Sequence, residues 1–326
     1  MEYQRVLITG AAGFIASNLA IYLVRKYPDS QFLGIDKLGY SSSVKNLDEI
    51  ITYPNFMFEK ADFTVQERME KLFREFKPDL VLHLGAYTHV DMSFNDSLTY
   101  SFNNYIGTHI LIECARKFGI KLFYYQSTDE VMGSREEISD ENSIMDPSNP
   151  YSSSKSGAEL LVRSYYHSFK TPVVISRGNN VFGPKQFPEK AIPKFILRLE
   201  KGLPPQIQGS GRQSRSFIYV DDFVEAVEII ILKGKVGGIY NVGSKYEVSI
   251  LQLASTLSQM YGKEEKVEFV IDRPFNDTRY LLDASKLFAL GFEQKVSFDE
   301  GLRRTITWYR EHPDNWTPTQ LELAEK

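Results

Sequence analysis

Two short segments of the 326-residue sequence carry side chains that could perform acid–base chemistry. In the first, Thr128 precedes two adjacent carboxylic acids, Asp129 and Glu130. In the second, Tyr151 and Lys155 are four residues apart, a spacing that puts both on one face of a helix. A lysine ammonium close to a phenol favours phenolate, so we expect the pKa of the tyrosine to fall below its usual value of about 10. Such a tyrosine can remove a proton from a hydroxyl group while hydride leaves the same carbon.

The adjacent carboxyls could divide acid and base work between them. One of the two can stay protonated as a general acid while its ionised neighbour acts as a base. They directly follow an expected strand, at the edge where open α/β sheets bind ligands. The alternative is a solvated acidic turn. The Y-x-x-x-K pattern also occurs by chance in many helices, but Pro150 is well placed to begin a helix here.

A glycine-rich segment near the N-terminus has the spacing of a dinucleotide-binding turn. Gly10 permits a tight turn, and Gly13 lets the backbone approach a pyrophosphate. The helix that begins with Phe14 and Ile15 supplies free N–H groups and a positive dipole. An alanine, Ala16, replaces the third glycine of the usual pattern and still permits close helix–strand packing.

Two carboxylates follow the next two expected strands. Asp36 ends the second strand, where its carboxylate can accept both ribose hydroxyls of NAD and repel the 2′-phosphate of NADP, although Lys37 weakens this preference. Asp62 follows the third strand and could reach the adenine. The segment as a whole predicts an NAD site, and the alternative is a glycine turn that only packs.

The elements that must position these residues alternate between strands and helices in the first half of the chain. This alternation predicts an α/β fold, a Rossmann-type doubly wound parallel sheet with helices on both faces. After residue 176 the alternation stops, and we expect a smaller α/β substrate-binding lobe. The expected strands are 5–9, 31–35, 55–60, 79–84, 121–125 and 172–176, and the expected helices are 14–27, 64–76, about 97–118 and one from near 151. The predicted division is an NAD-binding domain at 1–176 with a return segment near 216–243, and a lobe at 177–215 and 244–326.

Composition restricts the partners and the compartment. The net charge of −4 argues against nucleic acid as the main partner. No apolar run approaches the ~20 residues of a membrane span, and the first residues do not resemble a signal peptide. The single cysteine, Cys114, lies in an apolar run and fits a reducing compartment. We therefore expect a cytoplasmic protein with no membrane or nucleic-acid partner and no metal site.

Several segments resemble the nucleotide-glucose 4,6-dehydratases of the extended short-chain dehydrogenase/reductase family. The resemblance runs from residue 5 to about 316, and its most specific part is the Thr-Asp-Glu triplet. Related epimerases share the cofactor turn and the Tyr/Lys pair but generally lack the Asp-Glu pair. The segments that carry it are 127–131, 151–155, 179–184 and 186–190.

The resemblance implies a three-stage reaction that uses NAD as cofactor. Tyr151 deprotonates the glucose 4-hydroxyl as hydride passes from C4 to NAD, while Thr128 hydrogen-bonds that hydroxyl and Lys155 holds the nicotinamide ribose. The 4-ketone acidifies C5–H, so Glu130 removes this proton while Asp129 protonates the departing 6-hydroxyl. Hydride then returns to C6 and C5 is reprotonated. The product is a 4-keto-6-deoxy sugar nucleotide, a step toward rhamnose or another deoxysugar.

The resemblance also implies a binding site for the sugar nucleotide in the smaller lobe. Arg215 and Arg273 match the family's positions for ribose and diphosphate contacts, where the planar guanidinium can bridge two phosphate oxygens. Asn180 and Lys190 match other substrate contacts, and Asn104 aligns with an asparagine beside the sugar. For each basic residue, the alternative is an exposed surface charge.

The nucleotide is harder to predict, because one methyl group on the base, worth only ~1–3 kcal/mol in a pocket, separates UDP from dTDP. Segments 176–181, 193–197 and 273–277 look most like the UDP-glucose 4,6-dehydratase portion of plant rhamnose synthases, with the dTDP-glucose enzymes close behind. UDP-glucose is therefore favoured over dTDP-glucose. Met132, Tyr87 and Met92 depart from the family pattern and could reshape the pocket wall.

Two alternative functions remain open for these residues, and the helices also predict an oligomeric state. A nucleotide-sugar 4-epimerase or decarboxylase would share the fold, but the Asp-Glu pair argues against it. A non-catalytic NAD-binding regulator would keep the fold without turnover. We also expect a homodimer, because the helices from about Ser97 and from Tyr151 carry broad apolar faces and related enzymes pair through them as a four-helix bundle.

Overall fold

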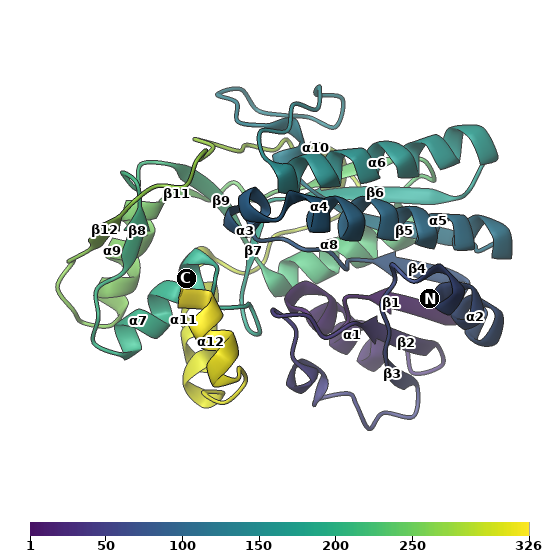
Figure 1. The fold of residues 1–326 in the computed structure, drawn as a ribbon, viewed down its shortest axis with the longest axis horizontal. Helices are drawn as coiled ribbons and strands as arrows, with labels where there is room; N and C mark the ends of the chain where they lie inside the picture. Colours follow the sequence, from purple (N-terminus) through teal and green to yellow (C-terminus); the bar gives the residue numbers. More distant parts are fainter. Residues whose placement is uncertain (326) are drawn as a thin grey trace.

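A seven-stranded parallel sheet forms the centre of the computed structural model, which describes residues 1–325 (Figure 1). Its strand order is β10-β6-β5-β4-β1-β2-β3, so the chain starts in the middle of the sheet and winds outward in both directions. Every neighbouring pair in this sheet is parallel. The strands are β1 (Arg5–Thr9), β2 (Gln31–Asp36), β3 (Phe56–Lys60), β4 (Leu80–His83), β5 (Leu122–Thr128), β6 (Val173–Gly178) and β10 (Ile239–Val242).

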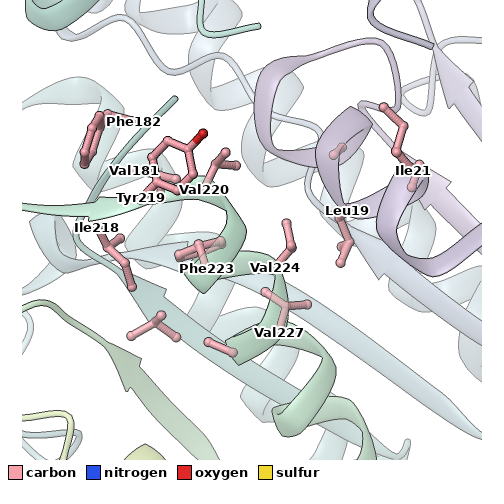
Figure 2. Packing of buried hydrophobic residues seen from close by; sticks show 14 of the residues in the cluster. Leu19, Ile21, Val181, Phe182, Ile218, Tyr219, Val220, Phe223, Val224 and Val227 are labelled. Atoms are coloured by element: carbon pink, nitrogen blue, oxygen red, sulfur yellow. The ribbon is translucent and has the colours of Figure 1, made fainter. Parts of the chain in front are cut away.

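Helices cover both faces of this sheet. Alternate strand residues point to opposite faces, so that Val6 and Ile8 pack in one core cluster and Leu7 packs in the other. On the first face, α1 (Phe14–Lys26) and α8 (Val220–Lys233) contribute apolar side chains such as Leu19 and Phe223 (Figure 2). On the second face lie α2 (Gln66–Phe76), α5 (Gly107–Phe118) and α6 (Pro150–Phe169). This arrangement confirms the predicted doubly wound fold.

The smaller elements gather beyond one end of the sheet, opposite the N-terminus (Figure 1). They include a three-stranded sheet in the order β11-β9-β7 and a two-stranded sheet of β8 and β12. Of the predicted return segment, α8 packs on the large sheet and β10 joins it. The elements are β7 (Asn180–Phe182), α7 (Ala191–Glu200), β8 (Gln206–Gln208), β9 (Ser214–Tyr219), β11 (Glu247–Ser249), α9 (Ile250–Met260), β12 (Glu268–Val270), α11 (Phe298–Glu311) and α12 (Pro318–Glu325). The short helix α10 (Ser285–Phe288) packs instead against β10 of the large sheet.

The helix expected over about 97–118 is not continuous. Helix α4 (Ser97–Tyr100) passes into a π-helical stretch, η2 (Ser101–Ile106), before α5 begins, and the short helix α3 (Val90–Asn95) precedes them. Inside the π-helical stretch, the amide of Asn104 exchanges hydrogen bonds with the backbone of Tyr87 instead of facing solvent. Tertiary contacts of this kind, which helix periodicity does not reveal, explain why the stretch departs from a regular α-helix.

The fifth strand is longer than expected and runs to Thr128 instead of ending at Tyr125. All of its residues are buried, so the apolar pattern alone underestimates its length. Within the described residues, no helix is both long enough and apolar enough to span a bilayer.

Candidate active site

Asp129 and Glu130 lie where β5 gives way to a short 3-10 helix, η3 (Asp129–Met132). The Thr128 hydroxyl donates to Asp129 Oδ1 at 3.0 Å and accepts from the Glu130 backbone N–H at 3.3 Å. The amide of Asn179 donates to Asp129 Oδ2 at 2.8 Å, so both oxygens of this carboxylate accept hydrogen bonds. The side chain of Asp129 is therefore held in one orientation by the last residue of β5 and by the residue that follows β6.

Burial changes the proton affinity of this pair. It raises the pKa of Asp129 to about 6, and burial together with the charge of Asp129 raises the pKa of Glu130 to about 7. The two carboxyls therefore share one proton near neutral pH. The hydrogen bonds accepted by Asp129 favour its ionised form, so the shared proton rests on Glu130. The expected roles, with Asp129 as acid and Glu130 as base, require the opposite arrangement when the C5 proton is removed.

Tyr151 and Lys155 occupy the first two turns of α6. Asn149 and Ser152 form a reciprocal capping box at its start, and Pro150 is its first residue, which explains why the helix begins there. Lys155 Nζ donates to the backbone oxygen of Gln126 at 2.6 Å. Burial lowers the pKa of the lysine to about 7 although Glu159 acts in the opposite direction.

The expected lowering of the Tyr151 pKa is wrong for the protein by itself. Burial, followed by the negative charge of Glu130, raises this pKa well above 10, whereas hydrogen bonding to Thr128 lowers it only in part. Lys155 is hydrogen-bonded to the backbone of β5 and is itself weakened as a cation by burial. Burial of the phenol, which the spacing of Tyr151 and Lys155 does not reveal, therefore outweighs the lysine charge.

The glycine turn after β1 has the geometry that a dinucleotide phosphate requires. Gly10 has φ +71°, and a Cβ at this position would lie 2.7 Å from the Cα of Gly85, so a larger residue does not fit. Asp36 accepts hydrogen bonds from the backbone of Ala12 at 3.2 Å and of Leu38 at 2.7 Å. A turn made only of glycine and alanine, a helix N-terminus and a fixed carboxylate therefore meet at one edge of the sheet, which fits NAD.

Two adjoining pockets contain most of the predicted site residues. The first is lined by the glycine turn with Phe14 and Ile15, by Asp36 and by the Thr128, Asp129, Tyr151 and Lys155 side chains. The second is lined by residues of the smaller elements, Arg215 and Arg273 among them. Glu130, Asn180 and Lys190 line both pockets. The structure therefore places Glu130 where the two pockets meet, with Asp129 beside it in the first pocket.

The two arginines are held by the segment that follows β12. Arg273 donates to Asn276 at 2.6 Å and forms an ion pair with Asp91 at 3.4 Å. Arg215 donates to the same Asn276 side chain at 3.3 Å and to the backbone oxygen of Asp277 at 3.0 Å. Asn276 accepts hydrogen bonds from both guanidinium groups, and both arginines line the second pocket. The two positive charges therefore lie close together in one pocket.

Among the described residues, Asp62 and Asn104 are the predicted site residues that line neither pocket. One oxygen of Asp62 accepts hydrogen bonds from the backbone and hydroxyl of Thr64, at 2.9 and 2.8 Å. The Asn104 side chain is bonded to the backbone of Tyr87 and to the Ser154 hydroxyl, so it supports the pocket wall from behind.

Sequence reasoning did not assign roles to Asn179 and Asp91. Asn179 orients Asp129 through its hydrogen bond. Asp91 forms an ion pair with Arg273 and accepts a hydrogen bond from the Gln208 amide at 2.8 Å. Both residues stand inside motifs that were visible in the sequence, the Asn-Asn pair before a Val-Phe-Gly-Pro stretch and a Thr-His-Val-Asp stretch. Their spacing along the chain did not reveal which side chains they contact.

Comparison with known proteins assigns this chain to a protein family. The family model described as GDP-mannose 4,6 dehydratase matches residues 7–305. The chain belongs to the nucleotide-sugar 4,6-dehydratases. This membership confirms the resemblance inferred from the Thr-Asp-Glu triplet and its companion motifs.

Individual members of this dehydratase family are similar over nearly the whole chain. The human dTDP-D-glucose 4,6-dehydratase is 44% identical over 328 residues, covering 98% of this chain and 94% of that protein. The trifunctional UDP-glucose 4,6-dehydratase/UDP-4-keto-6-deoxy-D-glucose 3,5-epimerase/UDP-4-keto-L-rhamnose-reductase of Arabidopsis thaliana is 44% identical over 320 residues. That alignment covers 96% of this chain but 48% of the longer plant protein.

A solved dehydratase structure has the same fold. The crystal structure of DesIV, a dTDP-glucose 4,6-dehydratase from Streptomyces venezuelae with NAD and TYD bound, matches with a TM-score of 0.93 and 34% identity. The match covers 97% of this chain and 99% of DesIV.

Proposed function

We propose that this chain is an NAD-dependent dehydratase that converts a nucleoside-diphosphate glucose to its 4-keto-6-deoxy product. The observation that carries the proposal is the Asp129–Glu130 pair beside Tyr151 and Lys155, with Asp129 buried and the half-buried Glu130 lining both pockets. An epimerase needs no acid and base at this position. A regulator without turnover would not require two carboxyls whose pKa values are raised toward neutrality.

We propose that NAD occupies the first pocket. Gly10, Gly13 and the N–H groups at Phe14 and Ile15 would receive its pyrophosphate, and Asp36 would receive a ribose. Bound there, NAD would accept hydride from the sugar C4 and return it to C6. The DesIV structure, which contains NAD, supports this assignment. Asp62, which would contact the adenine, lies outside the pocket lining.

The proposed reaction uses the remaining pocket residues in sequence. Tyr151 removes the proton of the 4-hydroxyl, with Thr128 hydrogen-bonded to the same hydroxyl, and Lys155 holds the nicotinamide ribose in place. Glu130 removes the C5 proton of the ketone, and Asp129 supplies a proton to the 6-hydroxyl, which leaves as water. After hydride has returned to C6, C5 is reprotonated. Because the protein by itself keeps the shared proton on Glu130, the proton must move to Asp129 before the C5 proton is removed.

The sugar nucleotide would lie in the second pocket, with Arg215 and Arg273 on its diphosphate and ribose. Asn180 and Lys190, which line both pockets, would contact the sugar, and Asn104 would support the wall behind it. We propose UDP-glucose as the preferred substrate and dTDP-glucose as the alternative. Relatives of both kinds are about equally similar to this chain, since the human and plant enzymes are each 44% identical.

The test of the proposed function is a dehydration assay with purified protein and NAD. UDP-glucose and dTDP-glucose are supplied separately, and mass spectrometry follows the loss of one water from each. We expect water loss from at least one of them, with the higher kcat/KM for UDP-glucose. Bound NAD without water loss from either would contradict the roles of Asp129 and Glu130 and favour an epimerase or a regulator. A higher kcat/KM for dTDP-glucose would overturn only the nucleotide preference.

We further propose a homodimer that pairs through α4–η2–α5 and α6. Leu98, Phe102 and Leu160 on these helices are 82%, 56% and 52% exposed, which is unusual for large apolar side chains and is typical of an interface. Light scattering at micromolar concentration should give the mass of a dimer. Leu160→Glu should shift it toward the monomer, and Leu203→Glu, which changes an exposed leucine elsewhere, should not. A monomeric wild type would contradict the proposal.

We propose in addition that the chain divides into an NAD-binding domain and a sugar-nucleotide lobe. We also propose that the protein is cytoplasmic.

A further inference from the structure

The loop Leu38–Ser43 follows β2 and lines the first pocket beside Asp36. Its Ser42 hydroxyl donates to Asp36 Oδ1 at 3.0 Å, so the loop contacts the carboxylate assigned to the cofactor ribose. Leu38 has φ +60°, a left-handed conformation that is unfavourable for a residue with a branched side chain. The loop conformation therefore depends on contacts from outside the loop.

The side chain of Gln320 supplies two of these contacts. Its Nε2 donates to the backbone oxygens of Tyr40 and Ser42, each at 2.9 Å. Its Oε1 accepts from the backbone N–H and the hydroxyl of Thr317, at 3.0 and 3.1 Å, in the capping box that starts α12 (yellow in Figure 1). Because both ends of the amide are bonded, its orientation is fixed.

A second connection runs from the same region to the glycine turn. The Ser43 hydroxyl donates to the backbone oxygen of Asn315 at 3.1 Å, and the Asn315 amide donates to Asn46 Oδ1 at 3.1 Å. The amide of Asn46, which is fully buried, donates to the backbone oxygen of Ala12 at 2.9 Å. Ala12 lies inside the turn between Gly10 and Gly13. The C-terminal region is thus hydrogen-bonded, through one buried side chain, to the proposed pyrophosphate site.

Aromatic packing keeps this region docked on the loop. Trp316 contacts Phe187 edge to face with ring centroids 5.0 Å apart, and Phe187 contacts Tyr40 in the same way at 5.6 Å. Trp316 and Phe187 are both buried, and Leu321 packs against the same cluster. Phe187 also lines the first pocket, so these contacts tie the loop, the pocket wall and the C-terminal region together.

We propose that residues 315–324, here termed the clasp, hold the loop Leu38–Ser43 closed over the adenosine half of the NAD site and so slow the release of NAD. Gln320 is its main positioning residue. The inference rests on the proposed function only in taking NAD as the ligand of the first pocket. Release of NAD requires the loop to move away from Asp36, and this movement breaks the hydrogen bonds from Gln320.

The variant Gln320→Glu tests the clasp without disrupting α12. Glutamate is the usual capping-box residue and keeps the bonds to Thr317, but it loses both N–H donors and directs a carboxylate oxygen at two backbone oxygens. We expect NADH release to be about tenfold faster, the ratio expected when one or two neutral hydrogen bonds are lost. Release is followed by NADH fluorescence during a chase with excess NAD. Hydrogen exchange of residues 38–43 should also become faster.

Gln252→Glu is the matched control. Gln252 makes the same capping box with Ser249 at the start of α9, away from the loop, with distances of 2.9 and 3.1 Å. We expect this variant to release NADH like the wild type and to unfold at the wild-type temperature, because it keeps its capping box. Equal release rates in the wild type and Gln320→Glu, or equal acceleration in both variants, would overturn the clasp.

The release experiment contains no sugar nucleotide, so its result is separate from that of the dehydration assay. Water loss together with unchanged release in Gln320→Glu would overturn the clasp alone. Faster release without water loss from any hexose nucleotide would overturn the proposed reaction alone. A wild-type protein that binds neither NAD nor NADH would overturn both.

Discussion

Replacement of Glu130 by glutamine is expected to slow water loss by about 10²–10⁴-fold while oxidation at C4 still proceeds. The amide keeps the shape of the carboxyl but cannot accept the C5 proton. Tyr151 and Lys155, which serve the earlier step, are unchanged. Reduced cofactor should therefore accumulate on mixing with substrate. The measurement combines the near-ultraviolet absorbance of NADH with mass spectrometry of the nucleotide sugar.

The companion variant Asp129→Asn distinguishes the role of Asp129 as acid from the role of Glu130 as base. It should keep exchange of the C5 hydrogen with solvent deuterium, because Glu130 remains, and lose most of the water loss. The carboxylate of Glu130 is the active form and its pKa is about 7, so wild-type exchange should fall as the pH drops through this value. Asp129→Asn removes the neighbouring charge that raises this pKa, so the fall should move to lower pH. Undiminished C5 exchange in Glu130→Gln would assign the base to another group.

Replacement of Tyr151 by phenylalanine is expected to stop the reaction one step earlier. Without the phenol oxygen no group removes the 4-hydroxyl proton, so neither reduced cofactor nor dehydrated product should form, with a loss of about 10²–10⁴-fold. The same two signals distinguish this variant from Glu130→Gln, in which reduced cofactor accumulates. Accumulation of NADH in Tyr151→Phe would contradict the role of Tyr151 as the base for C4 oxidation.

Tyr100→Phe provides the control for the loss of a buried hydroxyl. The Tyr100 ring meets Tyr151 edge to face at 6.5 Å, and its hydroxyl donates to the backbone oxygen of His89 at 2.6 Å. Removing this bond should cost about 1 kcal/mol of folding stability without removing a reacting group. The variant should therefore keep NADH formation. A loss as large as that of Tyr151→Phe would show that the tyrosine cluster, and not the Tyr151 oxygen, carries the effect.

Features of this protein that depend on neighbours along the chain were predictable from the amino-acid sequence alone. Gly10 and Gly13 predicted the turn because only residues without a large side chain tolerate it. Pro150 and the spacing of Tyr151 and Lys155 predicted a helix with both side chains on one face, and α6 has this form. The alternation of strand and helix patterns predicted the doubly wound sheet, since parallel strands need crossovers.

Tertiary structure decided the properties that depend on residues far apart in the sequence. The pKa of Tyr151 is raised, against the sequence-based expectation, because the phenol is buried by residues from several elements of the fold. The hydrogen bond from Asn179 to Asp129 joins residues 50 positions apart, and the bonds from Gln320 to the loop join residues about 280 apart. Residue type and spacing indicate which groups can react, but their charge state and orientation follow from packing, which only the folded chain specifies.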